Sequence, residues 1–246
     1  MAAQVMNMPI FEITPDDIAV LNDEQLRTLV GRLCEAELRR RGQSPVYVTY
    51  GGHQDAADGG IDVRVDLPQG SAIDGFIPRP NTCYQAKRQD MPPAKILEEL
   101  RPKGILRPAI QELAGQSGAY IIVSSKGSTT SRTLKNRRDA MLKAVAGGPS
   151  GQSLVVDFYD RNRLATWVRS HEALIPWVRE LVGKPIPGWQ SYGPWAAPVT
   201  EEYLKDDQLR LHPGKKTTET GLSAQQGIEA IRNELLHPRQ VVRLVG

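Results

Sequence analysis

Three polar side chains lie in stretches that otherwise have the pattern of buried strands. Asp62 lies near the start of the alternating run IDVRVDL (61–67), and Gln85 and Lys87 stand two positions apart in the run TCYQAKRQ (82–89). Successive side chains of a strand point to opposite faces, so Gln85 and Lys87 are expected to share one face. Charged groups in buried strands are costly unless they have a partner or a task. Taken one at a time, these features are equally typical of a solvated turn or of an exposed sheet face.

An acid is also predicted on the core-facing side of the first long helix. At about 100° per residue, Glu37 lies in the middle of the apolar stripe of this helix, whereas Glu35 points to almost the opposite side. The stripe is formed by Leu26, Leu29, Val30 and Leu33. A carboxylate in that position needs something positive to meet it. The alternative is a glutamate near the helix end that bends out to solvent.

These residue types together can do metal-dependent chemistry. The carboxylates of Asp62 and Glu37 and the side-chain carbonyl of Gln85 are hard oxygen ligands, which suit Mg²⁺ or Mn²⁺. The Lys87 ammonium would hold a water or the scissile phosphate and stabilise developing negative charge. A metal-activated water would then attack phosphorus in line. The set therefore predicts phosphodiester hydrolysis.

The order of these residues resembles a known group of nucleases. The motif GGID…QAK is similar to that of the PD-(D/E)xK nuclease superfamily, specifically its Mrr-like restriction-endonuclease branch, in which glutamine replaces the usual acid. The order of helix, Asp strand and QxK strand also fits, over roughly residues 15–170. The resemblance implies a restriction-endonuclease-like core, cleavage of double-stranded DNA with Mg²⁺ or Mn²⁺, and catalytic roles for Glu37, Asp62, Gln85 and Lys87.

Two features depart from that pattern. Asp62 and Gln85 are 23 positions apart (85 − 62), which leaves an insertion at 68–81. We expect this insertion to cover the site or to contact DNA. The acid of the helix also lies close to the helix end, which leaves Glu35 as a rival to Glu37.

The loop GGHQDAADGG (51–60) supplies further candidates. Asp58 is placed to reach the metal or to shape the loop, and the loop role is favoured. His53 is a candidate for a group behind the metal ligands or for a general base, although a loop histidine is more often neither. Gly59 and Gly60 permit a positive φ or a close backbone approach.

Two basic stretches are candidates for binding the DNA backbone. The run KGSTTSRTLKNRRDAMLK (126–143) combines cations with hydroxyls and a helix N-terminus, all of which can donate hydrogen bonds to phosphate oxygens. The second stretch, residues 39–41, is three arginines. The predicted DNA-binding residues are Arg39, Arg40, Lys126, Arg132, Lys135, Arg137 and Arg138. A solvated helix face explains the same pattern. No sequence-reading module is visible, so we expect weak sequence specificity.

The remaining pattern predicts the elements that position these residues. Strands are expected at 45–50, 61–67, 82–89, 119–125 and 153–160, and helices at 14–42, at 93–115 with a break near Pro102 and Gly104, at 128–145 and at 161–183. A helix, then strands, then alternating strands and helices indicate an α/β fold with a mixed central sheet flanked by helices.

The texture of the sequence changes after Gly183. We expect a nuclease domain at 1–185, an extended linker rich in Pro, Gly and aromatics at 186–222, and the start of a truncated P-loop NTPase module at 223–246. The last part is predicted to be a helix, a turn at Pro238 and a strand, with no GxxxxGK[ST] after it. This order resembles the N-terminal effector of bacterial STAND-type antiviral proteins, which implies activation by assembly into a dimer or tetramer of nuclease domains.

Composition places few limits on function. Apolar residues make up 40% and charged residues 24%, as in ordinary globular proteins, and a net charge of +3 is too weak to argue for nucleic acid by itself. Two cysteines, Cys34 and Cys83, favour a reducing cytosol. We expect no membrane span and no signal peptide, and therefore a cytoplasmic location.

Two rival functions remain open. One is a catalytically inactive DNA-binding or oligomerisation module of the same fold, against which the intact set of four site residues argues. The other is a hydrolase or nucleotide-binding α/β protein, which is disfavoured because the Gly-rich phosphate loop and the G-x-S-x-G elbow are missing.

Overall fold

The computed structural model describes residues 12–51, 60–146, 153–187, 210–212 and 221–235. The chain divides into two compact units, residues 1–191 and 192–246, and the division falls inside the segment predicted to be a linker. Across the described residues, none of the helices is long and apolar enough to cross a membrane.

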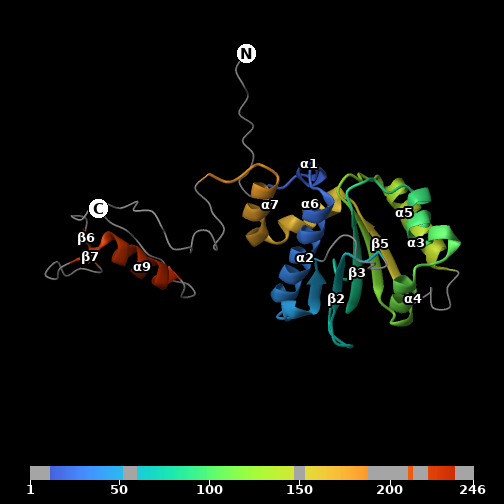
Figure 1. Ribbon diagram of the computed structural model, residues 1–246, viewed down its shortest axis with the longest axis horizontal. Coiled ribbons are helices and arrows are strands. Elements are labelled where there is room, and N and C mark those ends of the chain that lie inside the picture. Colours follow the sequence, from blue (N-terminus) through green and yellow to red (C-terminus); the bar gives the residue numbers. More distant parts are fainter. Residues whose placement is uncertain (1–11, 52–59, 147–152, 188–209, 213–220, 236–246) are drawn as a thin grey trace, which may run out of the picture. The chain divides into compact units, whose positions relative to one another are not determined.

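Unit 1 is built on a five-stranded sheet with the strand order β1-β2-β3-β4-β5 (Figure 1). The strands are β1 (Val48–Tyr50), β2 (Val63–Asp66), β3 (Asn81–Lys87), β4 (Ala119–Ser124) and β5 (Val155–Tyr159). The pairs β1–β2 and β2–β3 are antiparallel, while β3–β4 and β4–β5 are parallel. The predicted mixed α/β sheet is therefore confirmed.

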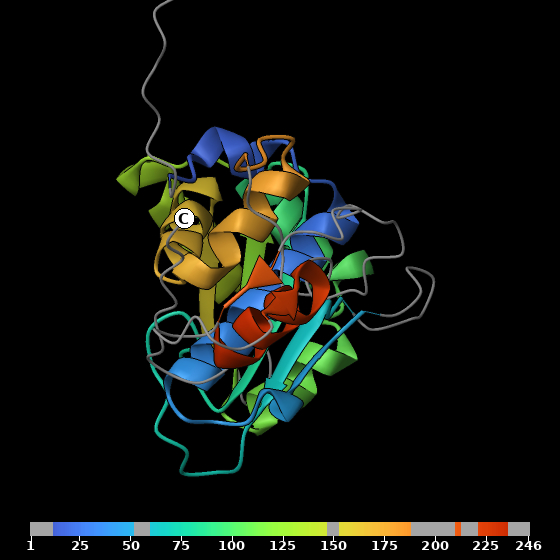
Figure 2. The same cartoon turned by 90° about the vertical axis from the view of Figure 1, so that its left-hand side faces the viewer.

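Helices cover both faces of this sheet (Figure 1). On one side lie α1 (Pro15–Ala19), α2 (Asp23–Arg40), α6 (Arg161–Arg169) and α7 (Ile175–Leu181); on the other lie α3 (Pro93–Leu100), α4 (Pro108–Gly115) and α5 (Ser131–Val145). Two short 3-10 turns, η2 (Pro102–Gly104) and η3 (Glu172–Leu174), join neighbouring helices. Figure 2 looks onto the side of unit 1 that carries α2.

Each face of the sheet has its own apolar core. Tyr84 and Ala86 of β3 belong to the core on the α2 side, whereas Cys83 belongs to the core under α3, α4 and α5. Because side chains alternate along a strand, Gln85 and Lys87 are on the α3–α5 side. β4 is buried along its whole length, as expected for a central parallel strand.

The helix predicted at 14–42 is interrupted. α1 ends at Ala19, and Asn22 starts α2 by accepting a hydrogen bond from the Gln25 backbone N–H, with the Gln25 side chain bonded back in a capping box. Gly42, the predicted stop, follows the end of α2 with a φ of +69°. The predicted helix at 93–115 is broken at η2, as expected, and the one at 161–183 is broken at η3.

A close packing contact fixes α2 against the edge strand. A Cβ on Gly31 would overlap the ring of Tyr50 on β1. The absence of a side chain there lets the helix approach the sheet. Arg27 lies one helical turn earlier than Gly31, so it is on the sheet-facing side of α2.

Unit 2 is described only in part. β6 (Arg210–Leu211) pairs antiparallel with β7 (Leu222–Ser223), and α9 (Ala224–Leu235) follows directly. The helix predicted after residue 223 is present. The predicted turn at Pro238 and the strand after it lie outside the described residues.

Candidate functional site

The structure places Asp62 beside Gln85 on neighbouring strands, with Lys87 two residues further along β3. Asp62 directly precedes β2; its N–H donates a 2.9 Å hydrogen bond to the Tyr84 carbonyl, and its Oδ2 accepts a 2.8 Å hydrogen bond from the Ala86 N–H. The β2–β3 register pairs Val63 with Tyr84, and its continuation by one residue places Asp62 beside Gln85. Lys87 is the last residue of β3.

Gln85 is held at both ends of its amide. Its Nε2 donates a 2.6 Å hydrogen bond to Glu99 Oε1, and its Oε1 accepts a 2.7 Å hydrogen bond from the Tyr120 hydroxyl. An ionised carboxylate accepts but cannot donate, so Glu99 fixes which end of the amide is the nitrogen. Gln85 is only 2% exposed, and its carbonyl oxygen has a set direction.

Glu99 on α3 is a further candidate for the site, and the sequence reasoning missed it. Besides Gln85, its carboxylate contacts Lys87 Nζ at 3.2 Å and the Arg107 guanidinium at 2.8 Å. Burial raises the pKa of Glu99, but the hydrogen bond from Gln85 and the nearby charges of Lys87 and Arg107 outweigh burial and lower that pKa overall. Glu99 therefore links the two candidate side chains of β3.

A sequence signal for Glu99 was available. Ile96 and Leu100 are buried on α3, and Glu99 lies three positions after Ile96 and one before Leu100. The signal is weaker than for Glu37, because at about 100° per residue Glu99 flanks this apolar stripe and does not lie within it, while the neighbouring Glu98 points further out and is exposed.

Gly60 shapes the backbone next to the amide. It has a φ of +87°, and a Cβ there would lie 3.2 Å from Gln85 Nε2 and 3.2 Å from Arg107 Cδ. Its carbonyl is 3.0 Å from the Tyr120 hydroxyl. The prediction of a positive φ and a close approach is confirmed for Gly60, while Gly59 lies outside the described residues.

A cation from α2 meets Asp62. Arg27 Nε lies 3.3 Å from Asp62 Oδ1, and the two side chains are 15% and 23% exposed. The helix α2 thus contributes a positive charge to this edge of the sheet, where the sequence predicted an acid.

Glu37 lies elsewhere, so its predicted role as a metal ligand beside Asp62 is wrong. Its side chain is buried, as predicted, but Arg40 and Arg41 bind Oε1 at 2.7 and 2.9 Å, and His171 Nε2 is 2.9 Å from Oε2. Glu37 is ten residues after Arg27 (37 − 27), which is about 15 Å along a helix. The prediction that Glu37 lies on the buried face of α2 is confirmed, but its expected position along the helix, next to Asp62, is not.

The ion pairs of Glu37 determine its charge state. Burial raises the pKa of Glu37, but hydrogen bonds from Arg40 and Arg41, the charge of Arg40 and the hydrogen bond with His171 lower it overall. Burial lowers the pKa of His171 despite the carboxylate beside it, so we describe the contact as a neutral imidazole donating to a carboxylate. This cluster ties the end of α2 to the segment after α6.

Glu35, the rival acid, does not reach the site either. Its Oε1 accepts a 3.0 Å hydrogen bond from the Tyr50 hydroxyl, and its Oε2 contacts Arg39 at 3.2 Å. It fastens α2 to β1.

The expectation that the insertion at 68–81 covers the site is wrong. The insertion leaves β2 at Asp66 and returns at Asn81, which is the end of the β2–β3 pair away from Asp62. The Phe76 ring stacks on Trp167, with ring centroids 4.9 Å apart, in the core on the α2 side. Gln85 and Lys87 face the other way. Contact of the insertion with DNA stays a prediction.

The predicted DNA-binding residues divide into two groups. Arg137 is 6% exposed and pairs with Asp90 at 2.6 Å, and Arg138 pairs with Asp157 at 2.6 Å. Arg39 and Arg40 pair with the acids near the end of α2. These four arginines have structural partners.

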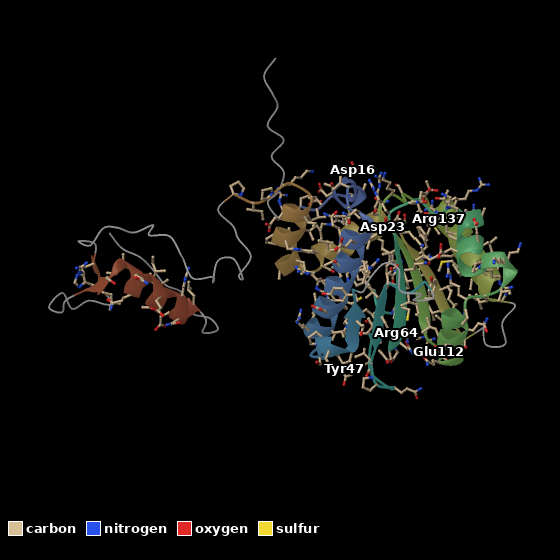
Figure 3. The ribbon with its side chains drawn as sticks, in the orientation of Figure 1. Asp16, Asp23, Tyr47, Arg64, Glu112 and Arg137 are labelled. Atoms are coloured by element: carbon tan, nitrogen blue, oxygen red, sulfur yellow. The ribbon has the colours of Figure 1, made fainter. Side chains whose placement is uncertain are left out.

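The other three predicted residues, Lys126, Arg132 and Lys135, are exposed. The Lys126 backbone N–H donates a 3.1 Å hydrogen bond to the Arg88 carbonyl, directly after β3. Figure 3 shows Asp23 and Arg137 toward one end of the sheet, and Tyr47 and Glu112 toward the other. Asp23 accepts a hydrogen bond from the Arg88 N–H, so the candidate site lies toward the Asp23 end.

The metal-binding prediction depends on both carboxylate oxygens and an amide oxygen. No group of three or more His, Cys, Asp or Glu side chains placed for a metal ion occurs in the part of the chain that the structure describes. The oxygen donors near this end of β3 are the Gln85 amide, the Glu99 carboxylate bonded to it, and the Asp62 carboxylate, which is bonded to the Ala86 N–H. The candidates His53 and Asp58 lie outside the described residues.

Comparison of the chain with protein-family models, with curated proteins and with solved structures finds no match in any of the three.

Proposed function

We propose that unit 1 is a metal-dependent endonuclease that hydrolyses phosphodiester bonds of double-stranded DNA. The observation that carries the proposal is the position of Asp62 beside Gln85 on neighbouring strands, with Glu99 joined to both Gln85 and Lys87 of β3. A carboxylate, an oriented amide oxygen and an ammonium within one cluster match the needs of phosphoryl transfer.

The donor set fits a hard divalent cation. Asp62 and the carbonyl oxygen of Gln85 would hold Mg²⁺ or Mn²⁺, and the bound ion would activate a water and polarise a phosphoryl oxygen. Gln85 Oε1 already accepts one hydrogen bond, and an amide oxygen has a second lone pair to offer. Glu37 takes no part in this set.

The chain's own residues perform the remaining tasks. Lys87, whose side chain is 30% exposed, stabilises the negative charge that develops on the phosphate oxygens. Glu99 positions the ammonium and the amide, and Tyr120 fixes the direction of the amide oxygen. Exposed Lys126, Arg132 and Lys135 supply non-specific contacts to the phosphate backbone.

Cleavage of plasmid and linear duplex DNA tests the proposal. The full chain is incubated with Mg²⁺, Mn²⁺ or a chelator over a range of protein concentrations, beside Lys87→Ala and Lys95→Ala. Lys95 is an exposed lysine on α3 that serves as the matched control. We expect metal-dependent cutting by the wild type and Lys95→Ala and its loss in Lys87→Ala. Cutting that survives in Lys87→Ala contradicts the assignment.

A second candidate function is a catalytically inactive DNA-binding or oligomerisation module. The ion pair between Arg27 and Asp62 favours it, because a cation already occupies the position next to the carboxylate. A pure binder keeps its affinity for duplex DNA in chelator and after Lys87→Ala, and it never cuts.

We also propose the wider context that the sequence order implies. The nuclease unit would act as the effector of a bacterial STAND-type defence protein, activated by assembly into a homo-oligomer in the cytoplasm. Two free, buried cysteines, Cys34 and Cys83, are compatible with a reducing compartment. A steep dependence of cleavage on protein concentration would support activation by assembly.

A further inference from the structure

The position of Arg27 leads to an inference about how the proposed site is loaded. Arg27 is on the sheet-facing side of α2, one turn before Gly31, and its side chain is 15% exposed. Such a cation needs a counter-charge, and the structure gives it Asp62 at 3.3 Å. The same carboxylate is the principal anionic oxygen donor of the proposed metal site.

Two of the contacts of the Asp62 carboxylate differ in length. Oδ2 accepts a 2.8 Å hydrogen bond from the Ala86 backbone, whereas Oδ1 meets Arg27 Nε at 3.3 Å. The backbone bond orients the carboxylate on the sheet. The longer contact is made by side chains alone, so its exchange would break no backbone hydrogen bond of the sheet.

Charge at the site favours a phosphate more than a free metal ion. Among the described residues in direct contact here, the cations Arg27, Lys87 and Arg107 face the carboxylates Asp62 and Glu99, a net charge of +1 (3 − 2). A divalent cation that arrives alone meets net positive charge. A metal that arrives with a phosphodiester brings its own anion.

An arginine is suited to exchange a carboxylate partner for a phosphate partner. A guanidinium binds a carboxylate or a phosphate with the same planar donors, and it remains charged throughout. Release of Arg27 from Asp62 therefore frees the carboxylate oxygen for the metal and supplies a donor for the phosphate in a single movement.

We propose that Arg27 is an exchangeable partner of Asp62, which it leaves for the scissile phosphate when the metal binds. Metal and DNA then bind the site together, and each raises the affinity for the other. This inference rests on the proposed nuclease function, but its test uses binding rather than cleavage.

The first measurement is the affinity of the DNA-free full chain for Mn²⁺, by titration calorimetry. Arg27→Gln and Arg27→Met both remove the charge, and Arg32→Gln is the control on the same helix, where the guanidinium lies over the Trp177 ring. We expect Mn²⁺ to bind roughly threefold or more tightly to the Arg27 variants, since the competing cation is gone. Arg32→Gln should match the wild type.

The second measurement is the salt dependence of duplex DNA binding, in a Lys87→Ala background that prevents cutting. With Mg²⁺, Arg27→Gln should weaken binding and reduce the slope of log K against log salt by about 1, the signature of one lost phosphate contact. In chelator the slopes should agree, because Arg27 then stays on Asp62. A residue that served the fold alone would not give this metal-dependent difference.

Either result can overturn the inference. Unchanged or weaker Mn²⁺ binding in both folded variants, or no Mn²⁺ binding by any of the proteins, would show that Arg27 does not compete with a metal at Asp62. An equal loss of slope with and without Mg²⁺ would show a permanent phosphate contact instead of an exchange. Cleavage by the wild type is scored separately, so failure of the nuclease proposal is distinguishable from failure of this one.

Discussion

Gln85 and Glu99 share a 2.6 Å hydrogen bond between a strand and a helix, and the other oxygen of the Glu99 carboxylate contacts Lys87. A single carboxylate thus sets both the direction of the amide and the position of the ammonium. Its partner Arg107 also donates a 2.7 Å hydrogen bond to the Glu99 backbone carbonyl, which holds the acid in place. The candidate pair of β3, Gln85 and Lys87, depends on α3 for its geometry.

The Glu99→Gln variant tests this dependence. The change keeps the size of the side chain and removes its charge, so Lys87 and Arg107 lose their common anion. We expect kcat for DNA cleavage to fall about 10- to 100-fold, as for other groups that orient metal ligands, with a small change in KM. The neighbouring Glu98→Gln is the matched control, since Glu98 is exposed. Equal rates for the two variants would remove Glu99 from the site.

The Gly60→Ala variant tests the close approach of the backbone to the amide. Gly60 and Gly70 have φ values of +87° and +85°, so alanine is strained at both positions and should cost about 1–2 kcal/mol of unfolding free energy. A Cβ meets Gln85 and Arg107 only at Gly60, and open space surrounds Gly70. In urea unfolding, Gly60→Ala should therefore lose at least as much unfolding free energy as Gly70→Ala. DNA cleavage should fall only in Gly60→Ala. A fall in both variants would make the effect one of stability.

The Asp62→Asn variant separates the charge of this residue from its hydrogen bond. The amide oxygen can still accept from the Ala86 N–H, so the strand edge is kept, but the anion that faces Arg27 is lost. We expect cleavage to disappear, Mn²⁺ binding to weaken at least tenfold, and the melting temperature to fall, because the largely buried Arg27 loses its counter-charge. Asp66→Asn, at the exposed end of β2, is the control. Metal binding that persists in Asp62→Asn would place the metal elsewhere.

Sequence patterns were informative about faces and directions. Alternation along β3 placed Gln85 and Lys87 on one face, and the angular test placed Glu37 on the buried side of α2. Both results follow from fixed local periods of strand and helix. The break near Pro102 also followed from a local rule, since proline lacks the N–H that a helix interior needs.

Those patterns did not predict how far along a helix a contact falls, or which side chains contact each other. Whether Glu37 or Arg27 meets Asp62 depends on how far α2 slides along the sheet, and the close contact of Gly31 with Tyr50 fixes that register. The crossing of α3 over β3 brings Glu99 to Gln85 in the same way. These are tertiary distances, so a period along the chain carries no information about them.

The cluster around Glu37 leads to a prediction about acid stability. The pKa of Glu37 is lowered in the folded protein from a value of 4.5, so the unfolded chain takes up this proton at a higher pH than the folded chain. Its contribution to stability is therefore present above pH 4.5 and is lost as the pH falls through the folded pKa. The pKa of His171 is lowered from 6.5, and here too the unfolded state binds the proton first, so acid acts in the same direction from about pH 6.5 downward.

Melting curves of Glu37→Gln between pH 7 and pH 3.5 test this assignment. The variant should lose about 2 kcal/mol of unfolding free energy at pH 7, because a charged acceptor for Arg40, Arg41 and His171 is removed. Its stability should then fall less steeply than that of the wild type below pH 4.5. Glu35→Gln, which removes a carboxylate from the same helix, is the control. We expect Glu37→Gln to keep its DNA cleavage, because about 15 Å of helix lies between Arg27, which contacts Asp62, and Glu37. Loss of cleavage in a folded Glu37→Gln protein would contradict the conclusion that Glu37 takes no part in the site.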